Sequence, residues 1–180
     1  MQQFSVNVFG VMDVIKAILP HFRTRQSGLI INITSQGGRV TFPTCSLYHA
    51  TKFAIEGFSE SLAYELLSQN ISVKIIEPGS TESNFFSAVS MAGDERITAY
   101  EEFDKIALNN WNKNDTMSSK TAEIAEVIYT AASDNKDQLR YMAGTDTHLY
   151  FGARQNKSDQ DYVDYMRKLF IPEILNKEFK

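Results

Sequence analysis

Residues 29–33 read Leu-Ile-Ile-Asn-Ile, and residues 34–38 continue Thr-Ser-Gln-Gly-Gly. A short apolar run that ends in turn residues is typical of a buried strand. The chain then enters a stretch, 46–68, whose apolar residues recur at helical spacing. A second apolar run, 71–76, follows and ends in Glu-Pro-Gly. This strand–helix–strand order predicts parallel strands in a doubly wound α/β sheet.

The rest of the chain continues the alternation of helices and strands. A helix is expected over 3–22, with Pro20 bending its last turn. Further elements are expected downstream: helical patches around 85–91 and 98–111, a helix over 121–133, a last strand over 139–143 and a helix over 158–170. The length of 180 residues suits a single domain, 1–180.

The segment 79–119 is long and polar, and it follows the end of a predicted strand. Open α/β sheets bind ligands at that edge, so this segment is predicted to cover a substrate. The alternative is a surface excursion that packs only on itself. Its aromatic residues either line an apolar pocket or belong to the core; they are Phe85, Phe86, Tyr100, Phe103 and Trp111.

Tyr48 and Lys52 are four residues apart in the predicted helix, so phenol and ammonium share one face. A nearby cation lowers the pKa of a phenol, which is otherwise about 10. Tyr48 could then act as an acid or base near neutral pH, with the hydroxyl of Ser35 close by to hold an oxygen atom. The spacing alone occurs by chance roughly half a time in such a chain, so an ordinary amphipathic helix is the alternative.

The order of the surrounding motifs is more specific. Asn7 stands in Val-Asn-Val-Phe-Gly, Ser35 in Asn-Ile-Thr-Ser-Gln-Gly-Gly, Tyr48 precedes Lys52, and Pro78-Gly79 follows the next strand. In this order and spacing, residues from about 3 to 85 resemble the short-chain dehydrogenase/reductase family. The segment 139–144 is similar to the family's last strand, though less distinctively.

The resemblance implies a partial Rossmann-like fold and an NAD- or NADP-dependent oxidoreductase that moves a hydride between nicotinamide and a carbonyl or alcohol carbon. Tyr48 would exchange the proton, Lys52 would hold the nicotinamide ribose, and Ser35 would orient the substrate oxygen. Asn7 would disturb its helix and hold a water molecule. The implied cofactor-binding residues are Tyr48, Lys52, Pro78, Gly79, Thr81 and Ser83. The family also implies a homodimer or larger oligomer formed by the helices 3–22 and 46–68.

The departure from the family pattern concerns the cofactor. No Gly-x-x-x-Gly-x-Gly or Gly-x-Gly-x-x-Gly occurs in the 180 residues, and that turn carries the pyrophosphate in dinucleotide-binding folds. The chain therefore resembles the carboxyl-terminal, catalytic portion of such an enzyme. Two alternatives stay open: a truncated, non-catalytic module that acts through a partner, and a sugar-epimerase type of the same superfamily.

Composition limits the partners. The net charge of −4 and the pI near 5.4 give no basic surface for nucleic acid or an anionic membrane. The single cysteine, Cys45, fits a reducing compartment, and we expect a cytoplasmic protein. Residues 4–19 are mostly apolar, but Asp13 and Lys16 interrupt them, and no stretch is expected to reach membrane-spanning length. The three histidines are too dispersed to predict a metal site.

Overall fold

The computed structural model describes residues 2–85, 89, 96–114 and 117–175. Its centre is a parallel sheet with the strand order β1 (Gly28–Ile33), β2 (Ile71–Pro78) and β5 (Arg140–Ala143). β1 and β2 pair from Gly28–Ile71 to Ile33–Ile76, and β5 pairs with the last four residues of β2. Both pairs are parallel, so the predicted α/β class is confirmed. Helices connect the strands, as parallel pairing requires.

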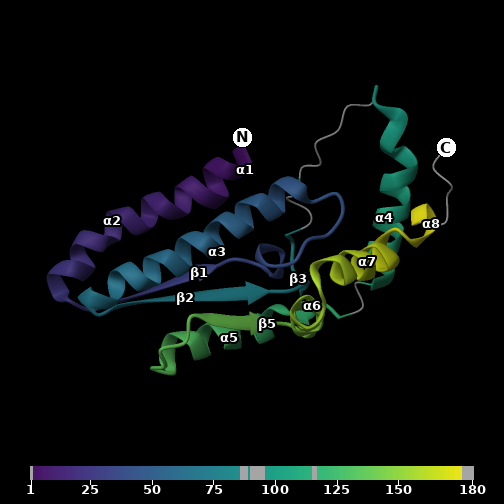
Figure 1. The fold of residues 1–180 in the computed structure, drawn as a ribbon. Coiled ribbons are helices and arrows are strands. Elements are labelled where there is room, and N and C mark those ends of the chain that lie inside the picture. Colours follow the sequence, from purple (N-terminus) through teal and green to yellow (C-terminus); the bar gives the residue numbers. More distant parts are fainter. Residues whose placement is uncertain (1, 86–88, 90–95, 115–116, 176–180) are drawn as a thin grey trace.

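Helices cover the two faces of this sheet (Figure 1). One face carries the N-terminal helix and α3 (Ser46–Leu66), and the other carries α5 (Thr121–Ser133). The N-terminal helix consists of α1 (Gln2–Phe4), a π-helical segment η1 (Ser5–Phe9) and α2 (Gly10–Arg25). Two apolar clusters fill the layers. One contains Ile15, Ile30, Leu62, Leu66, Ile71 and Val73, and the other contains Ile76, Ile124, Ala131, Tyr141 and Ala143.

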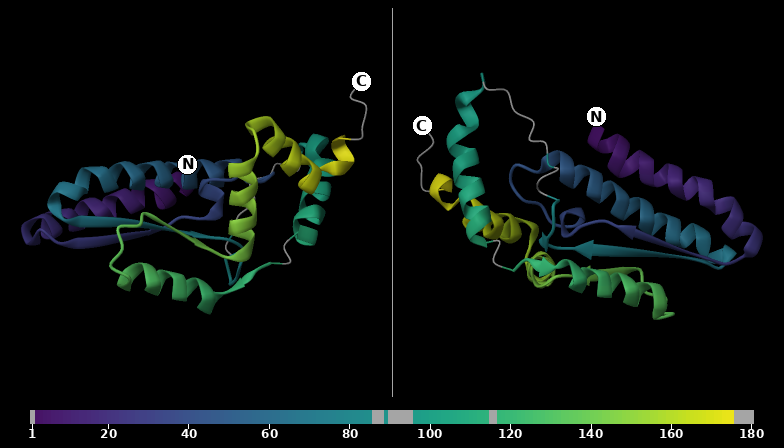
Figure 2. Two further views of the ribbon diagram at one scale, coloured as in Figure 1. Left: turned by 60° about the horizontal axis from the view of Figure 1, so that its bottom comes forward. Right: turned by 180° about the vertical axis from the view of Figure 1, so that it is seen from behind.

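The carboxyl-terminal part lies beside the carboxyl ends of the strands (Figures 1 and 2). Its helices are α4 (Glu101–Asn114), α6 (Thr145–Asn156), α7 (Asp159–Phe170) and α8 (Pro172–Leu175). Aromatic residues from α4, α6 and α7 surround Phe42, which comes from the loop after β1. Short elements complete the fold: η2 (Gln36–Gly38), η3 (Leu67–Gln69), β3 (Thr81–Glu82), η5 (Thr98–Tyr100) and β4 (Ser119–Lys120), with β3 and β4 forming a small parallel pair.

Several predictions of local structure need correction. The N-terminal helix runs through Pro20 to Arg25 and ends where Gln26 adopts a left-handed conformation with φ of 48°. By length and composition alone, the 24-residue helix Gln2–Arg25 could cross a membrane, so the expectation that no stretch reaches that length is wrong. Core helices of soluble proteins and N-terminal signal sequences pass the same test, and this helix packs on α3 and β1.

The helix α6 was not predicted, because its buried positions include the polar residues Asp146 and Thr147, which disguise the apolar pattern. The patch around 98–111 corresponds to η5 and α4. Most of the patch around 85–91 lies outside the described residues. The helix over 121–133 is confirmed at both ends.

Candidate active site

Three segments meet where the parallel strands end. Ser35 follows β1, its Oγ accepts a hydrogen bond from the backbone N–H of Gly37 at 3.0 Å, and it thereby caps the short helix η2. The same hydroxyl lies 3.5 Å from the carbonyl oxygen of Pro78, at the end of β2. The first turn of α3 brings Tyr48 to this edge. The carboxyl ends of parallel strands are where open α/β sheets bind ligands.

Tyr48 is half-buried and makes a side-chain hydrogen bond with Ser35. Burial raises the pKa of Tyr48, and the bond with Ser35 only partly opposes this. The expectation that the pKa of Tyr48 lies near neutral pH is therefore not met in the folded chain, because the effect of burial is the largest. Burial therefore favours the neutral phenol over the phenolate.

Lys52 lies one helical turn beyond Tyr48, with its Nζ 5.8 Å from the centre of the phenol ring. The Nζ also donates a hydrogen bond to the carbonyl oxygen of Ile33 at 3.4 Å. Burial lowers the pKa of Lys52, and the carboxylate of Glu56 partly offsets that effect. The ammonium is thus held between the helix and the end of β1, below the phenol.

Asn7 lies in the π-helical segment η1, as expected of a residue that disturbs its helix. Its Nδ2 donates to Oγ1 of Thr51 at 3.2 Å, and that hydroxyl donates to the carbonyl oxygen of Tyr48 at 2.7 Å. Thr51 has no exposed surface. The N-terminal helix is therefore tied to α3 at the turn that carries Tyr48.

Besides Tyr48 and Lys52, four residues were predicted to contact the cofactor, and they lie at and just after the end of β2. The backbone N–H of Gly79 donates to the carbonyl oxygen of Ala143, and Oγ1 of Thr81 donates to the carbonyl oxygen of Gly79 at 3.1 Å. Ser83 is exposed and its Oγ accepts from the N–H of Phe85. Pro78 and Gly79 therefore lie at the same edge as Ser35.

The predicted aromatic pocket is only partly present. The ring of Phe85 lies 6.1 Å from that of Tyr48, so it borders the site. Trp111 instead packs edge-on against Phe42 at 4.9 Å and belongs to the core around that residue. Tyr100 is exposed, Phe103 is half-buried, and Phe86 lies outside the described residues.

Comparison with known proteins places the chain in a family. Residues 1–92 match the family model of the short chain dehydrogenases. The chain belongs to the short-chain dehydrogenase family. It is 39% identical over 165 residues to an uncharacterized oxidoreductase of Schizosaccharomyces pombe, covering 92% of this chain and 69% of that relative.

Two solved structures show the same short-chain dehydrogenase fold. A short-chain dehydrogenase from Streptomyces avermitilis has a TM-score of 0.71 at 29% identity. A 3-oxoacyl-[acyl-carrier protein] reductase from Brucella melitensis, with bound NAD, has a TM-score of 0.55 at 25% identity. They cover 96% and 77% of this chain, whereas the chain spans only 62% and 48% of theirs.

One buried polar residue at this sheet edge was not predicted. Asp146, at the start of α6, is buried, and its Oδ2 accepts from Nε2 of Gln36 and from the N–H of Ser80, both at 2.7 Å. Burial raises the pKa of Asp146. It joins the loop after β1 to the loop after β2. Its place just after a predicted parallel strand is the signal that would have identified it.

Proposed function

We propose that this short-chain dehydrogenase transfers a hydride between NAD or NADP and a carbonyl or alcohol substrate. The observation that supports this most is the meeting of the hydroxyls of Ser35 and Tyr48 above the ammonium of Lys52, at the ligand-binding edge of a parallel sheet. Two hydroxyls and a cation suit a nicotinamide ribose and a carbonyl oxygen. The cofactor would supply or accept the hydride.

The chain's own residues manage the proton. Tyr48, kept neutral by burial, donates its phenolic proton to the carbonyl oxygen of the substrate as negative charge develops there. Ser35 donates a hydrogen bond to the same oxygen and orients it. Lys52 stabilises the phenolate that remains, and Asn7 together with Thr51 steadies the turn that carries Tyr48.

The residues fit the nicotinamide end of the cofactor. A glycine-rich pyrophosphate turn is not part of the 180 residues, and this observation favours the second candidate, a non-catalytic module completed by a partner.

An activity assay separates the two candidates. Purified chain should be assayed with NADH and NADPH against aldehydes and ketones, following nicotinamide absorbance. We expect Tyr48→Phe to abolish turnover and Tyr129→Phe, at an exposed position on α5, to leave it unchanged. Full activity in Tyr48→Phe would reject this mechanism, and folded wild-type chain without turnover would favour the module.

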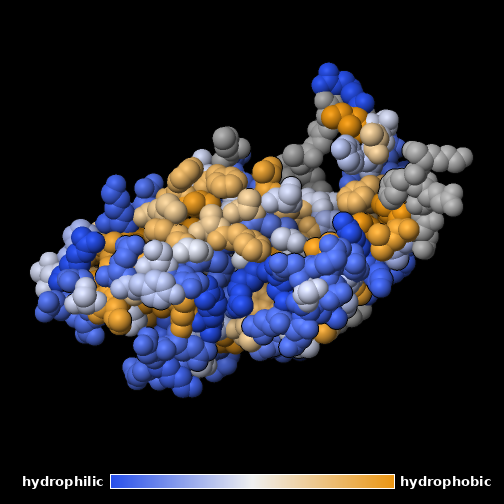
Figure 3. All heavy atoms as spheres, viewed as in Figure 1, coloured by the Kyte–Doolittle hydropathy of each residue, from blue (hydrophilic) through white to orange (hydrophobic). Residues whose placement is uncertain are grey.

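We also propose a cytoplasmic homodimer or larger homo-oligomer that associates through the N-terminal helix and α3. Apolar residues gather on the face of the molecule where these helices lie (Figure 3). The exposed ones include Val6, Phe9 and Val14 on the first helix and Leu47, Phe53 and Tyr64 on α3. A stable monomer at micromolar concentration in sedimentation experiments would contradict this proposal.

A further inference from the structure

A buried acid, Glu77, is the last residue but one of β2 and immediately precedes the candidate cofactor contact at Pro78. The side chain of Glu77 has no exposed surface. Its Oε1 lies 3.4 Å from Nη1 of Arg39 and 3.5 Å from Nε of Arg140, whereas Oε2 has no hydrogen-bond partner among the described residues. A fully buried carboxyl group is costly to ionise unless it is paired, so the partners of Glu77 decide what it does.

Glu56 connects the same cluster to α3. It lies one turn beyond Lys52, on the helix face that also carries Tyr48. Its Oε1 accepts a hydrogen bond from Oγ1 of Thr34, the residue before Ser35, and its Oε2 lies 3.1 Å from Nε of Arg140. The carboxylate of Glu56 raises the pKa of Lys52 and so opposes the lowering that burial causes.

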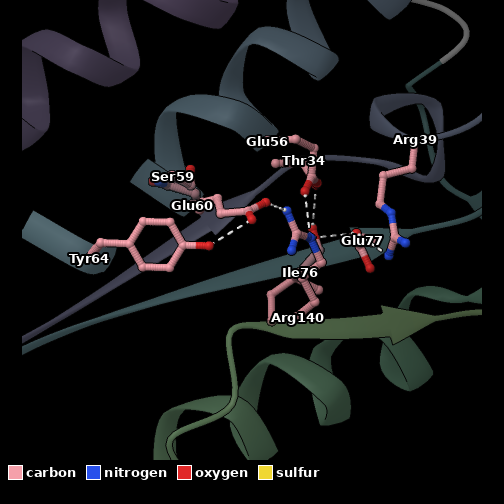
Figure 4. A network of polar contacts seen from close by, with 10 residues as sticks. Thr34, Arg39, Glu56, Ser59, Glu60, Tyr64, Ile76, Glu77 and Arg140 are labelled. Carbon is pink, nitrogen blue, oxygen red and sulfur yellow. Dashed lines mark hydrogen bonds and ion pairs between the residues drawn. The ribbon is translucent and has the colours of Figure 1, made fainter. Parts of the chain in front are cut away.

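Arg140, at the start of β5, joins the two acids. Its Nε lies between the carboxylates of Glu56 and Glu77, and its Nη2 donates to Glu60 at 2.6 Å (Figure 4). We call this set of residues the carboxylate–arginine network; its members are Thr34, Arg39, Glu56, Glu60, Glu77 and Arg140. Its members come from β2, β5, α3 and the segment that follows β1, and Thr34 and Glu77 directly precede Ser35 and Pro78 in the chain.

We propose that the carboxylate–arginine network positions Ser35, the Tyr48–Lys52 helix turn and Pro78 relative to one another, and that Glu77 is the member that holds or releases a proton. This inference rests on the proposed function, because it concerns the same site. Thr34 is the direct link: its Oγ1 contacts both Glu56 of α3 and the carbonyl oxygen of Ile76 in β2.

The charges of the network explain the role of Glu77. Glu56, Glu60 and Glu77 face two guanidinium groups, those of Arg39 and Arg140, so full ionisation leaves one excess negative charge. Burial and the repulsion of Glu56 raise the pKa of Glu77 to about 7, against the opposing attraction of both arginines. Lys52 is the further cation next to Glu56. Protonation of Glu77 would remove the excess negative charge inside the network.

The Thr34 link can be tested with a matched pair of variants. Thr34→Val keeps the shape and removes the hydroxyl, whereas Thr34→Ser keeps the hydroxyl. We expect Thr34→Val to lower kcat by about tenfold to a hundredfold, because a small displacement of Ser35 misaligns the proton donor, with the KM for the cofactor changed less than about threefold. Thr34→Ser should keep a kcat close to that of wild type. Equal kcat losses in both variants, or no loss in Thr34→Val, would overturn the proposal.

A second readout does not depend on activity and separates this proposal from the proposed function. Hydrogen exchange of the backbone amides of Gly37 and Gly38 should accelerate at least tenfold in Thr34→Val and not in Thr34→Ser. Carbon-13 NMR of labelled glutamate should show a carboxyl that titrates near pH 7 and disappears in Glu77→Gln. If wild-type chain has no turnover but both results hold, the network is supported and the hydride-transfer proposal fails. Unchanged exchange in Thr34→Val, or no such titration, overturns the network.

Discussion

Gly79 lies so close to Asp146 that a Cβ atom built on Gly79 would stand 1.9 Å from Oδ1 of Asp146. The loop after β2 therefore approaches α6 at a distance that only glycine permits. Asp146 is also fixed by Gln36 and Ser80, so it cannot withdraw without losing hydrogen bonds. The absence of a side chain at Gly79 is a packing requirement of the site.

We predict that Gly79→Ala lowers the free energy of unfolding by about 1–3 kcal/mol, because a buried carboxylate must shift to admit the methyl group. Gly57→Ala is the matched control. Gly57 lies within α3 with open space around its Cα, so alanine there should stabilise the helix by about 0.5–1 kcal/mol. Urea denaturation measures both. If the two variants have equal stability, the close approach of Gly79 and Asp146 is not as described.

His49 is predicted to fasten the loop after β1 to α3. Its Nδ1 donates to the carbonyl oxygen of Gly37, and its Nε2 accepts from the N–H of Phe42, each at 2.8 Å. This pattern needs a neutral ring, and burial lowers the pKa of His49 from 6.5. The unfolded chain therefore binds the proton more readily, and wild-type stability should fall as the pH drops below about 6.5.

Three substitutions separate the two bonds of His49. His49→Leu loses both and should cost about 1–3 kcal/mol. Asn reaches the position of Nδ1 and Gln that of Nε2, so each should retain one bond and part of the stability. In none of the three variants should the free energy of unfolding show the decrease below about pH 6.5 that protonation of His49 causes in wild type. Denaturation at pH 5 and pH 7.5 measures this, and an identical pH dependence in His49→Gln and wild type would contradict it.

The sequence predicted the positions of those residues whose placement follows from local order. Tyr48 and Lys52 share a helix face by spacing, and Ser35 and Pro78 follow two apolar strands that had to end at one sheet edge. Glu56 and Arg140 could not be predicted, because they are 84 residues apart and meet only when β5 pairs with β2. Glu77 and Asp146 are buried polar residues, and in a sequence such residues look solvent-exposed.

Glu77→Gln is predicted to change how stability depends on pH. The pKa of Glu77 is raised from 4.5 to about 7 in the folded chain, so the folded state keeps a proton that the unfolded state releases. The stabilisation is complete below pH 4.5 and is lost as the pH rises through 7. Relative to wild type, Glu77→Gln should therefore gain up to about 3 kcal/mol between pH 4.5 and pH 8. A constant difference between the two proteins across that range would contradict the assignment.

The cofactor preference of the 180-residue chain gives a further prediction. Because it carries no glycine-rich turn, the adenosine half of NADH should add little binding energy. We expect reduced nicotinamide mononucleotide and NADH to bind weakly, with dissociation constants within about threefold of each other. Fluorescence titration of the nicotinamide measures both, and Lys52→Met should weaken both equally. Submicromolar NADH binding would show that another part of this chain holds the pyrophosphate.

The last prediction concerns the outer edge of β1. Within the described residues, β1 pairs only with β2. Leu29 and Ile33 of β1 are 36% and 47% exposed on the sheet face that α5 covers only partly. Natural proteins protect an apolar edge with charges, proline, bulges or a covering segment, and this edge shows no charged residue in β1. We therefore expect the isolated chain to self-associate through this strand or to melt without cooperativity.

Leu29→Lys tests the edge, because a lysine on an edge strand opposes pairing with another chain. Its matched control is Leu67→Lys, which makes the same change at a residue that is 70% exposed but lies in η3, outside the sheet. Light scattering during heating should fall in Leu29→Lys and stay at the wild-type level in Leu67→Lys. If both variants reduce scattering equally, general surface hydrophobicity drives the association. If wild-type chain stays monodisperse and melts in one sharp transition, the edge of β1 is protected and the prediction is wrong.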